Sequence, residues 1–451
     1  MAHDARGRRR GGSGAASTAS ADTLRFPLAG AASEARGSAD ASVASDAISF
    51  PLTIAVLHWI VVQLAASLAF RNGTPNAILS PPYQTMPPPL TGLAHLLVEP
   101  LRQWDGLWYK LIAEQGYGGS GEFQAAFWPL YPWIMDYGGR LTGWTVDSVG
   151  YIVSHLAFAA ALVLLYRLIT LDFNPMVARR TLLALAFFPT AYFFSAVYTE
   201  SLFLLCIVGA LLAARLGHWW VAGAVGLLAA LTRSYGILLL IPFAVLFFQQ
   251  YRLDFRRWLP NILPVAFPAL GPLIYAYYLR EVVDDPLAFF TKQSGWDRYS
   301  LPPWETIRCG VVSCYNLGGE PDGATWGWLS TLLQTPTWQT LTSQPFRLDF
   351  ANSDTLELIC ALLFLALALL GLRALPLYQT TFLLPGLIIP LYQPSQVHAL
   401  MSIPRFGLTL FPLFVVLALI FKGRLAAVAL PLSTLLLVIL TIQFTHWYWV
   451  S

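Results

Sequence analysis

Charged residues and cysteines are both scarce in this chain of 451 residues. Only 11% of the residues are charged, whereas soluble domains carry about 25%, and 56% are hydrophobic. An ordinary water-soluble protein is therefore excluded. Disorder over the whole length is excluded as well, because aromatic residues make up 14% and long apolar runs recur from about residue 50. These features predict an all-α polytopic integral membrane protein.

Lysine and the common metal and nucleotide motifs are also lacking. The net charge is only +3 and three residues are Lys, so no basic surface for nucleic acid is predicted. The chain has no HExxH pair and no glycine-rich phosphate loop, and we expect neither a metal nor a cofactor. Cys206 and Cys360 lie in apolar runs and are expected in the core. Cys309 and Cys314 share a polar segment where a disulfide can form, and the sequence leaves its formation open.

The chain is expected to consist of a tail and one membrane domain. Residues 1–47 are rich in Ala, Ser and Gly and predict a disordered tail, and residues 48–451 predict the membrane domain. Eleven apolar segments are candidate spans, within a range of nine to thirteen because proline divides several of them. They lie at about 50–70, 150–169, 181–197, 201–216, 219–232, 236–250, 260–279, 355–371, 376–391, 405–421 and 425–444.

The positions of Arg and Lys predict the orientation. With the Arg-rich tail in the cytoplasm, the short loops on that side carry Arg167, Arg179, Arg180, Arg215, Arg252, Arg256, Arg257, Arg373, Lys422 and Arg424. Two long segments, about 71–149 and 280–354, and most acidic residues outside the tail then lie on the outer side. Any chemistry is therefore expected to face outward.

The segment 104–117 is the first candidate for chemistry. Trp104, Trp108 and Ile112 recur at helical spacing, which predicts a short helix in the outer membrane interface. Asp105 lies beside this apolar stripe, where a carboxylate suits a general base. Asp is also a favoured N-cap residue, and the spacing alone favours the cap. A second interfacial element, 123–140, is interpreted as an aromatic belt that anchors the loop.

Two pairs of charged residues lie at the outer ends of predicted spans. Glu200 and Arg233 are costly there unless they pair with each other or contact a polar ligand, and both alternatives stay open. Arg405 can hold a phosphate through two parallel hydrogen bonds, with His398 as a third donor. The alternative for Arg405 is that its side chain only reaches to the interface.

The outer segment 289–298 interleaves aromatic and polar residues and continues to Trp304. Such interleaving suits a sugar, which offers a CH face for stacking and hydroxyls for hydrogen bonds. It suits an ordinary hydrated loop nearly as well.

Several motifs occur in a characteristic order between residues 100 and 450. They are Trp104-Asp105 with Tyr109, residues 112–117 and 127–132, Asn174-Pro175, residues 187–189 and 198–203, Thr232-Arg233-Ser234 and Pro404-Arg405-Phe406. Together they resemble the PIG-V-like mannosyltransferases, which are GT-C membrane glycosyltransferases. The resemblance implies a GT-C-like bundle with interfacial helices on the first outer loop.

The resemblance also implies an activity. Mannose, the sugar that the resemblance implies, is expected to move from a polyprenyl-phosphate donor of the dolichyl-phosphate type to an acceptor hydroxyl on the extracytoplasmic side, with inversion. Asp105 matches the acidic residue of the first outer loop and is thereby implied to be the catalytic base. Matching polar positions and the pattern above suggest that the substrates contact Trp104, Tyr109, Glu200, Arg233, His398 and Arg405.

Other features leave alternatives open. The Arg-rich, Lys-poor composition predicts a bacterial plasma membrane protein, and Tyr235 stands where the family pattern favours a small polar residue, so the acceptor stays open. The donor lipid, the acceptor and the bilayer are the expected partners, and a protein partner is not predicted. A transporter or lipid flippase, a GT-C enzyme for another sugar and a noncatalytic subunit are the alternatives.

Overall fold

The computed structural model describes residues 29–72, 89–118, 123–252, 254–311, 353–395, 398–448 and 450. The chain divides into two units, Met1–Asp46 and Ala47–Ser451. Helix α1 (Ala29–Asn72) begins in the first unit, within the segment 1–47 that was expected to be without structure. Alanine recurs throughout this part of α1 and has the highest helix propensity, which explains the helix. The predicted tail at 1–28 lies outside the described residues.

The second unit is helical, which confirms the predicted all-α membrane fold. Within the described residues the only strand-like pairing is a bridge between Arg298 and Ser395. After α1, the elements are α2 (Gly92–Leu97), η1 (Glu99–Leu101), α3 (Asp105–Gln115), η2 (Gln124–Ala126), α4 (Leu130–Thr142), α5 (Val146–Asp172), α6 (Pro175–Ala186), η3 (Ala191–Phe194), α7 (Glu200–Arg215), α8 (Trp219–Thr232), η4 (Ser234–Leu239), α9 (Leu240–Tyr251), α10 (Phe255–Trp258), α11 (Ile262–Val265), η5 (Phe267–Ala269), α12 (Leu270–Val283), α13 (Ala288–Thr291), η6 (Lys292–Trp296), α14 (Pro303–Val311), α17 (Ser353–Ala374), α18 (Leu377–Leu391), α19 (Ile403–Thr409), α20 (Pro412–Ile420) and α21 (Gly423–Thr445).

Fewer helices are long enough to cross a membrane than the eleven spans predicted. Five described helices qualify by length and hydropathy: Asp46–Asn72, Val146–Asp172, Ser234–Tyr251, Thr355–Ala374 and Gly423–Thr445. Helices α19 and α20 would add a sixth span, although they meet at 85°. The count of eleven is therefore not confirmed. Several predicted spans are short or broken, and 260–279 is divided into α11, η5 and α12, with prolines at 264 and 268.

A buried segment without α-helix, residues 187–199, follows α6. Its polar groups find partners in neighbouring elements, as buried backbone requires. The His58 ring lies 2.7 Å from the carbonyl oxygen of Ala186 and 3.1 Å from Ser195 Oγ. The Val197 amide donates to the Leu101 carbonyl oxygen at 3.0 Å. This segment is thereby fixed, and it carries the residues that precede Glu200.

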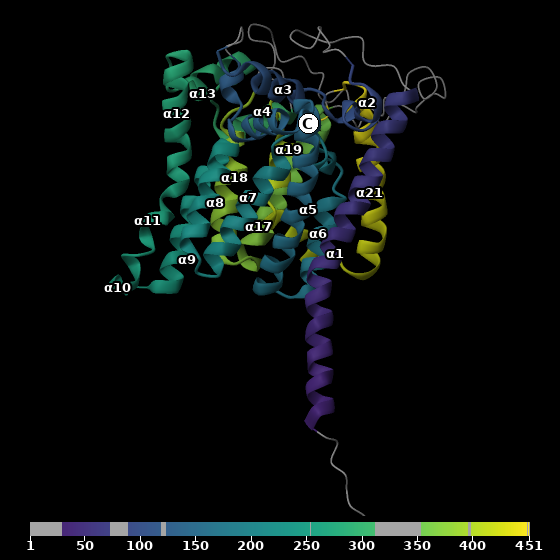
Figure 1. Cartoon of the computed structure of the whole chain (residues 1–451), viewed down its shortest axis with the longest axis vertical. Coiled ribbons are helices and arrows are strands. Elements are labelled where there is room, and N and C mark those ends of the chain that lie inside the picture. The colour runs from purple at the N-terminus through teal and green to yellow at the C-terminus, as the bar shows by residue number, and fades with distance from the viewer. Residues whose placement is uncertain are drawn as a thin grey trace, which may run out of the picture. The chain divides into compact units, whose positions relative to one another are not determined.

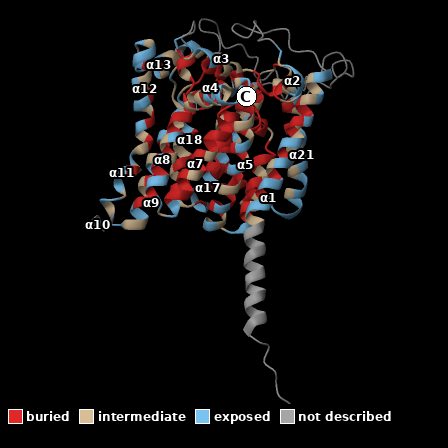
Figure 2. Cartoon of the chain, viewed as in Figure 1, coloured by how far each residue is buried: buried red, intermediate tan, exposed pale blue. Residues whose placement is uncertain are grey.

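The core of the second unit is aromatic and aliphatic. Figure 2 shows buried residues concentrated in the central helices, among them α5, α7 and α17. Helix α5 begins with Thr145 as its N-cap, and α6 begins with Asn174, whose side chain accepts from the Val177 amide at 3.0 Å. The predicted core residues Cys206 and Cys360 are buried and free. Cys309 is disulfide-bonded, and Cys314 lies outside the described residues.

The two ends of the helical bundle differ in character. Helices α2, α3, α4 and α13 lie at one end of this unit, and α10 lies at the opposite end (Figure 1). Near the latter end, Arg215 Nε donates to Asp172 Oδ1 at 3.1 Å, and Gln379 Nε2 donates to Asp172 Oδ2 at 2.8 Å. Arg215 belongs to the set expected in the cytoplasm. Which end faces the cytoplasm stays a prediction.

Candidate active site

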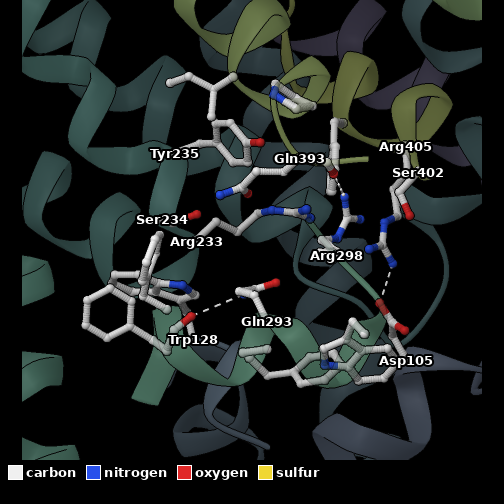
Figure 3. A pocket seen from close by; sticks show the side chains of 18 of the residues that line it. Asp105, Trp128, Arg233, Ser234, Tyr235, Gln293, Arg298, Gln393, Ser402 and Arg405 are labelled. Atoms are coloured by element: carbon white, nitrogen blue, oxygen red, sulfur yellow. Dashed lines mark hydrogen bonds and ion pairs between the residues drawn. The ribbon is translucent and has the colours of Figure 1, made fainter. Parts of the chain in front are cut away.

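A cavity of about 350 Å³ lies beneath the short helices α3 and α13. This volume falls within the range of small-molecule sites. Figure 3 shows its polar residues turned toward a common space. The lining consists of Asp105, Tyr109, Ala126, Phe127, Trp128, Thr232, Arg233, Ser234, Tyr235, Ile237, Leu238, Phe289, Phe290, Gln293, Trp296, Arg298, Ile389, Pro390, Gln393, Met401, Ser402, Arg405 and Phe406.

Asp105 and Arg405 form an ion pair across the cavity wall. Arg405 Nη1 donates to Asp105 Oδ2 (Figure 3), and both side chains are about nine-tenths buried. Within the described residues, Asp105 Oδ1 has no hydrogen-bond partner. One carboxylate oxygen is therefore held by a cation, while the other stays available to a ligand in the cavity.

The start of α3 is fixed so that Asp105 faces the cavity. The Asp105 amide donates to Tyr198 OH at 3.1 Å, and this hydroxyl donates to the Gln103 carbonyl oxygen, also at 3.1 Å. Trp104 is the N-cap and has a φ of 54°, which is uncommon for a non-glycine residue and recurs at functional sites. The helix start has no side-chain cap, so the expected capping role of Asp105 is wrong.

Glu200 joins two of the arginines. Its carboxylate is fully buried at the start of α7, pairs with Arg233 Nη1, and lies 3.4 Å from Arg405 Nε through Oε1. Arg233 also donates to Thr199 Oγ1 at 3.2 Å, and Tyr109 OH lies 3.2 Å from the same oxygen. Burial and the charge of Glu200 raise the pKa of Tyr109, so its hydroxyl keeps its proton.

Arg233 is placed by a tight turn between α8 and η4. Gly236 packs directly against the end of α8, where an added Cβ would lie 2.3 Å from the Ala230 amide nitrogen. No other residue fits at this position without movement of the backbone. Arg233 pairs with Glu200, which is the first alternative from the sequence, and it also lines the cavity, while contact with a polar ligand stays a prediction.

The segment 289–298 forms a further wall of the cavity. Trp296 packs against Trp108 and Phe127, with ring centroids 5.5 and 5.7 Å apart, which joins η6 to the first outer loop. Trp128 packs against Phe289 with centroids 5.5 Å apart. Except for Trp108, these rings line the cavity together with Gln293. The segment 289–298 and the aromatic residues near 128 thus contribute to the cavity wall.

Most of the residues selected from the sequence lie together at this site. Asp105, Tyr109, Arg233 and Arg405 line the cavity, and Glu200 lies behind the two arginines. Two others are not among the lining residues: the Trp104 ring packs against Trp447 at 5.8 Å, and His398 lies outside the lining set. Sequence reasoning did not select Arg298, Gln293, Ser402 or Gln393, although Gln293 and Arg298 belong to the aromatic segment considered for sugar binding.

One side of the cavity is apolar and opens toward the outside of the bundle. Ile237 in η4 and Ile389 in α18 line it, and each is 37% exposed. Phe290 in α13 also lines it and is 64% exposed. Ile237 lies in the candidate span Ser234–Tyr251, and exposed apolar side chains on spanning helices contact lipid. The cavity is therefore bounded by charged groups on one side and by apolar residues that reach the surface on the other.

Fold and site together define an integral membrane protein with a charged cavity suited to a polar substrate. Residues 45–257 match the family model described as Mannosyltransferase (PIG-V). This match, over a little less than half of the chain, supports a PIG-V-like mannosyltransferase family and indicates a glycosyltransferase. No curated protein and no solved structure matches it significantly. The matched region contains Asp105, Glu200 and Arg233 and ends before Arg298 and Arg405.

Proposed function

We propose that the protein transfers mannose from a polyprenyl-phosphate donor to an acceptor hydroxyl, with Asp105 as the base. The observation that carries the proposal is the cavity itself, in which a carboxylate and three arginines lie opposite an apolar side with partly exposed Ile237 and Ile389. A lipid-linked donor consists of an apolar chain, an anionic phosphate and a polar sugar. These parts would lie against the apolar side, the arginines and the polar residues of the cavity.

The chemistry follows from the geometry of Asp105. The acceptor oxygen attacks the anomeric carbon, the bond from that carbon to the phosphate oxygen breaks, and the hydroxyl proton passes to Asp105 Oδ1. Arg405 on Oδ2 orients the carboxylate. Direct displacement inverts the anomeric centre. The phosphate leaves as an anion stabilised by the arginines, so no separate general acid is required.

The apolar side of the cavity favours a lipid-linked donor over a soluble nucleotide sugar. A polyprenyl chain would leave the cavity between η4 and α18, past Ile237 and Ile389, and continue into the bilayer. The sugar would lie among Trp128, Gln293 and Trp296, where ring faces and an amide can contact it. We propose that this site faces the extracytoplasmic side of a bacterial plasma membrane.

The test is a transfer assay with the purified protein in lipid vesicles. Radiolabelled mannose is supplied either as polyprenyl-phosphate mannose or as guanosine diphosphate mannose, with a mixed lipid extract as acceptor. We expect a labelled product only from the lipid-linked donor, and the mass of the product identifies the acceptor.

Two outcomes would contradict the proposal. Labelling from the nucleotide sugar alone would exclude the lipid donor. No turnover with mannose, glucose or pentose lipid donors, despite a folded protein, would favour the transporter or noncatalytic alternatives.

A further inference from the structure

Three guanidinium groups surround a single phenylalanine ring at the cavity. The Cζ atoms of Arg233, Arg298 and Arg405 lie 5.1, 6.0 and 5.5 Å from the centroid of the Phe406 ring. Figure 3 shows the guanidinium of Arg298 between those of the other two. Three cations in so small a space repel one another unless anions compensate for them.

Two of these cations are compensated by carboxylates of the protein. Arg405 pairs with Asp105, and Arg233 pairs with Glu200, which also lies 3.4 Å from Arg405 Nε. Two arginines and two carboxylates therefore form one connected and balanced network. Neither Arg405 nor Arg233 carries a surplus charge toward a ligand.

Arg298 differs because its partners are neutral. Its Nη1 donates to the Gln393 carbonyl oxygen at 2.7 Å and its Nη2 to the Met401 carbonyl oxygen at 3.5 Å. Among the described residues, no carboxylate lies within ion-pair distance of Arg298. The buried Glu357 accepts the Ser402 amide at 3.2 Å, and Glu357 and Asp105 act on Arg298 through space without an ion pair.

The backbone holds Arg298 in place before any ligand binds. The backbone of Arg298 pairs with that of Ser395 in an antiparallel bridge. The Tyr299 amide donates to the Pro394 carbonyl oxygen at 3.1 Å. Burial lowers the pKa of Arg298, with the nearby Arg405 charge acting in the same direction. A partly buried cation with neutral partners is costly, and a bound anion would reduce that cost.

We propose that Arg298 is the residue that binds the donor phosphate, whereas Arg405 positions Asp105. This inference rests on the proposed function and refines the expectation that Arg405 holds the phosphate. A polyprenyl-phosphate sugar is a phosphodiester with one negative charge, which matches the one guanidinium of the three that forms no ion pair with a carboxylate among the described residues. The product polyprenyl phosphate carries between one and a half and two negative charges at pH 7 and should bind more tightly.

The test compares lipid binding by Arg298→Gln and the wild-type protein in nanodiscs. The probes are polyprenyl phosphate and the neutral polyprenol of the same chain length, so the ratio of their Kd values isolates the phosphate. We expect Arg298→Gln to reduce the preference for phosphate by about 10- to 100-fold, as expected for a charge-assisted hydrogen bond. Arg298→Lys, which keeps the charge, should recover part of it.

Arg308→Gln is the matched control. Arg308 lies on α14, is 60% exposed and pairs with Glu305, so its loss should leave the ratio unchanged. Arg405→Gln should lower kcat far more than it raises KM for the donor, since Arg405 acts through Asp105. An unchanged preference in Arg298→Gln, or a loss of preference only in Arg405→Gln, would overturn the assignment.

The binding measurement separates this inference from the proposed function. If the wild-type protein prefers polyprenyl phosphate through Arg298 but transfers no mannose, the assignment of Arg298 stands and the proposed reaction is wrong. If the wild-type protein transfers mannose and Arg298→Gln changes neither the Kd ratio nor the KM, the proposed reaction stands and the assignment of Arg298 is wrong.

Discussion

Replacement of Asp105 by Asn gives the sharpest test of the chemistry. Asn keeps the size of the side chain and can still accept a hydrogen bond from Arg405, but it cannot take a proton from the acceptor. Removal of a general base lowers the rate by about 100- to 10,000-fold. That loss corresponds to about 2.7 to 5.4 kcal/mol of transition-state stabilisation.

The same substitution also affects stability, and the structure limits the size of that effect. Removal of one partner from a buried ion pair costs about 3 to 5 kcal/mol when the other charge is left uncompensated. The charge of Arg405 would keep a partner, because Glu200 lies 3.4 Å from its Nε and the Asn carbonyl oxygen can accept a hydrogen bond from its Nη1. We therefore expect a loss below about 3 kcal/mol and a folded variant.

The assay measures kcat with polyprenyl-phosphate mannose and, in the same preparation, the thermal unfolding temperature and the Kd for polyprenyl phosphate. Asp136→Asn is the control, since Asp136 pairs with the exposed Arg140 on α4 and lies outside the cavity lining. Retention of a tenth or more of the wild-type rate by Asp105→Asn, with donor binding intact, would refute the role of Asp105 as base.

Two further substitutions test how the site is built. Glu200→Gln removes the carboxylate that joins two arginines, and we expect it to lower the unfolding free energy by about 2 to 4 kcal/mol, whereas Glu305→Gln in an exposed pair should cost less than about 1 kcal/mol. Equal unfolding temperatures for the two variants would contradict the bridging role. Gly236→Ala should cost about 1 to 3 kcal/mol because its Cβ meets backbone at 2.3 Å, and Gly209→Ala, with its nearest contact at 3.5 Å, should be tolerated. Thermal unfolding in detergent measures both, and a Gly236→Ala protein as stable as wild type would show that the turn is not closely packed.

Local periodicity accounts for what the sequence predicted well. The spacing of Trp104, Trp108 and Ile112 predicted a short helix there, and α3 (Asp105–Gln115) is that helix. Helix α4 (Leu130–Thr142) likewise overlaps the second predicted interfacial element, 123–140. Such patterns depend only on neighbours along the chain, so one sequence contains them in full.

Apolar runs predicted the membrane class correctly, but the described helices do not confirm the predicted number of spans. A run such as 260–279 is apolar enough to cross a membrane, yet its prolines divide it into three short elements. Residues 187–199 are apolar because they are buried within the protein, not because they form a helix in lipid. Hydropathy shows that a segment is apolar, but it does not distinguish burial within the protein from contact with lipid.

The roles of the arginines could not be separated from the sequence. Arg233, Arg298 and Arg405 have the same side chain, and their roles differ only through their partners. The carboxylate that pairs with Arg405 lies 300 residues earlier in the chain, and that of Arg233 lies 33 residues earlier. The neutral partners of Arg298 are backbone carbonyls. Every residue has a backbone carbonyl, so the residue types in the sequence do not indicate which ones contact Arg298.

The region matched by the family model contains only part of the charged site. The matched residues 45–257 supply Asp105, Glu200 and Arg233, and hence two carboxylates with one cation. This part alone would present an excess of negative charge to a phosphate donor. Arg298 and Arg405 follow the matched region and supply two further cations at the cavity. Under the proposed function, binding of an anionic donor therefore requires the later helices to pack against the earlier ones, even though the proposed base lies in the first part.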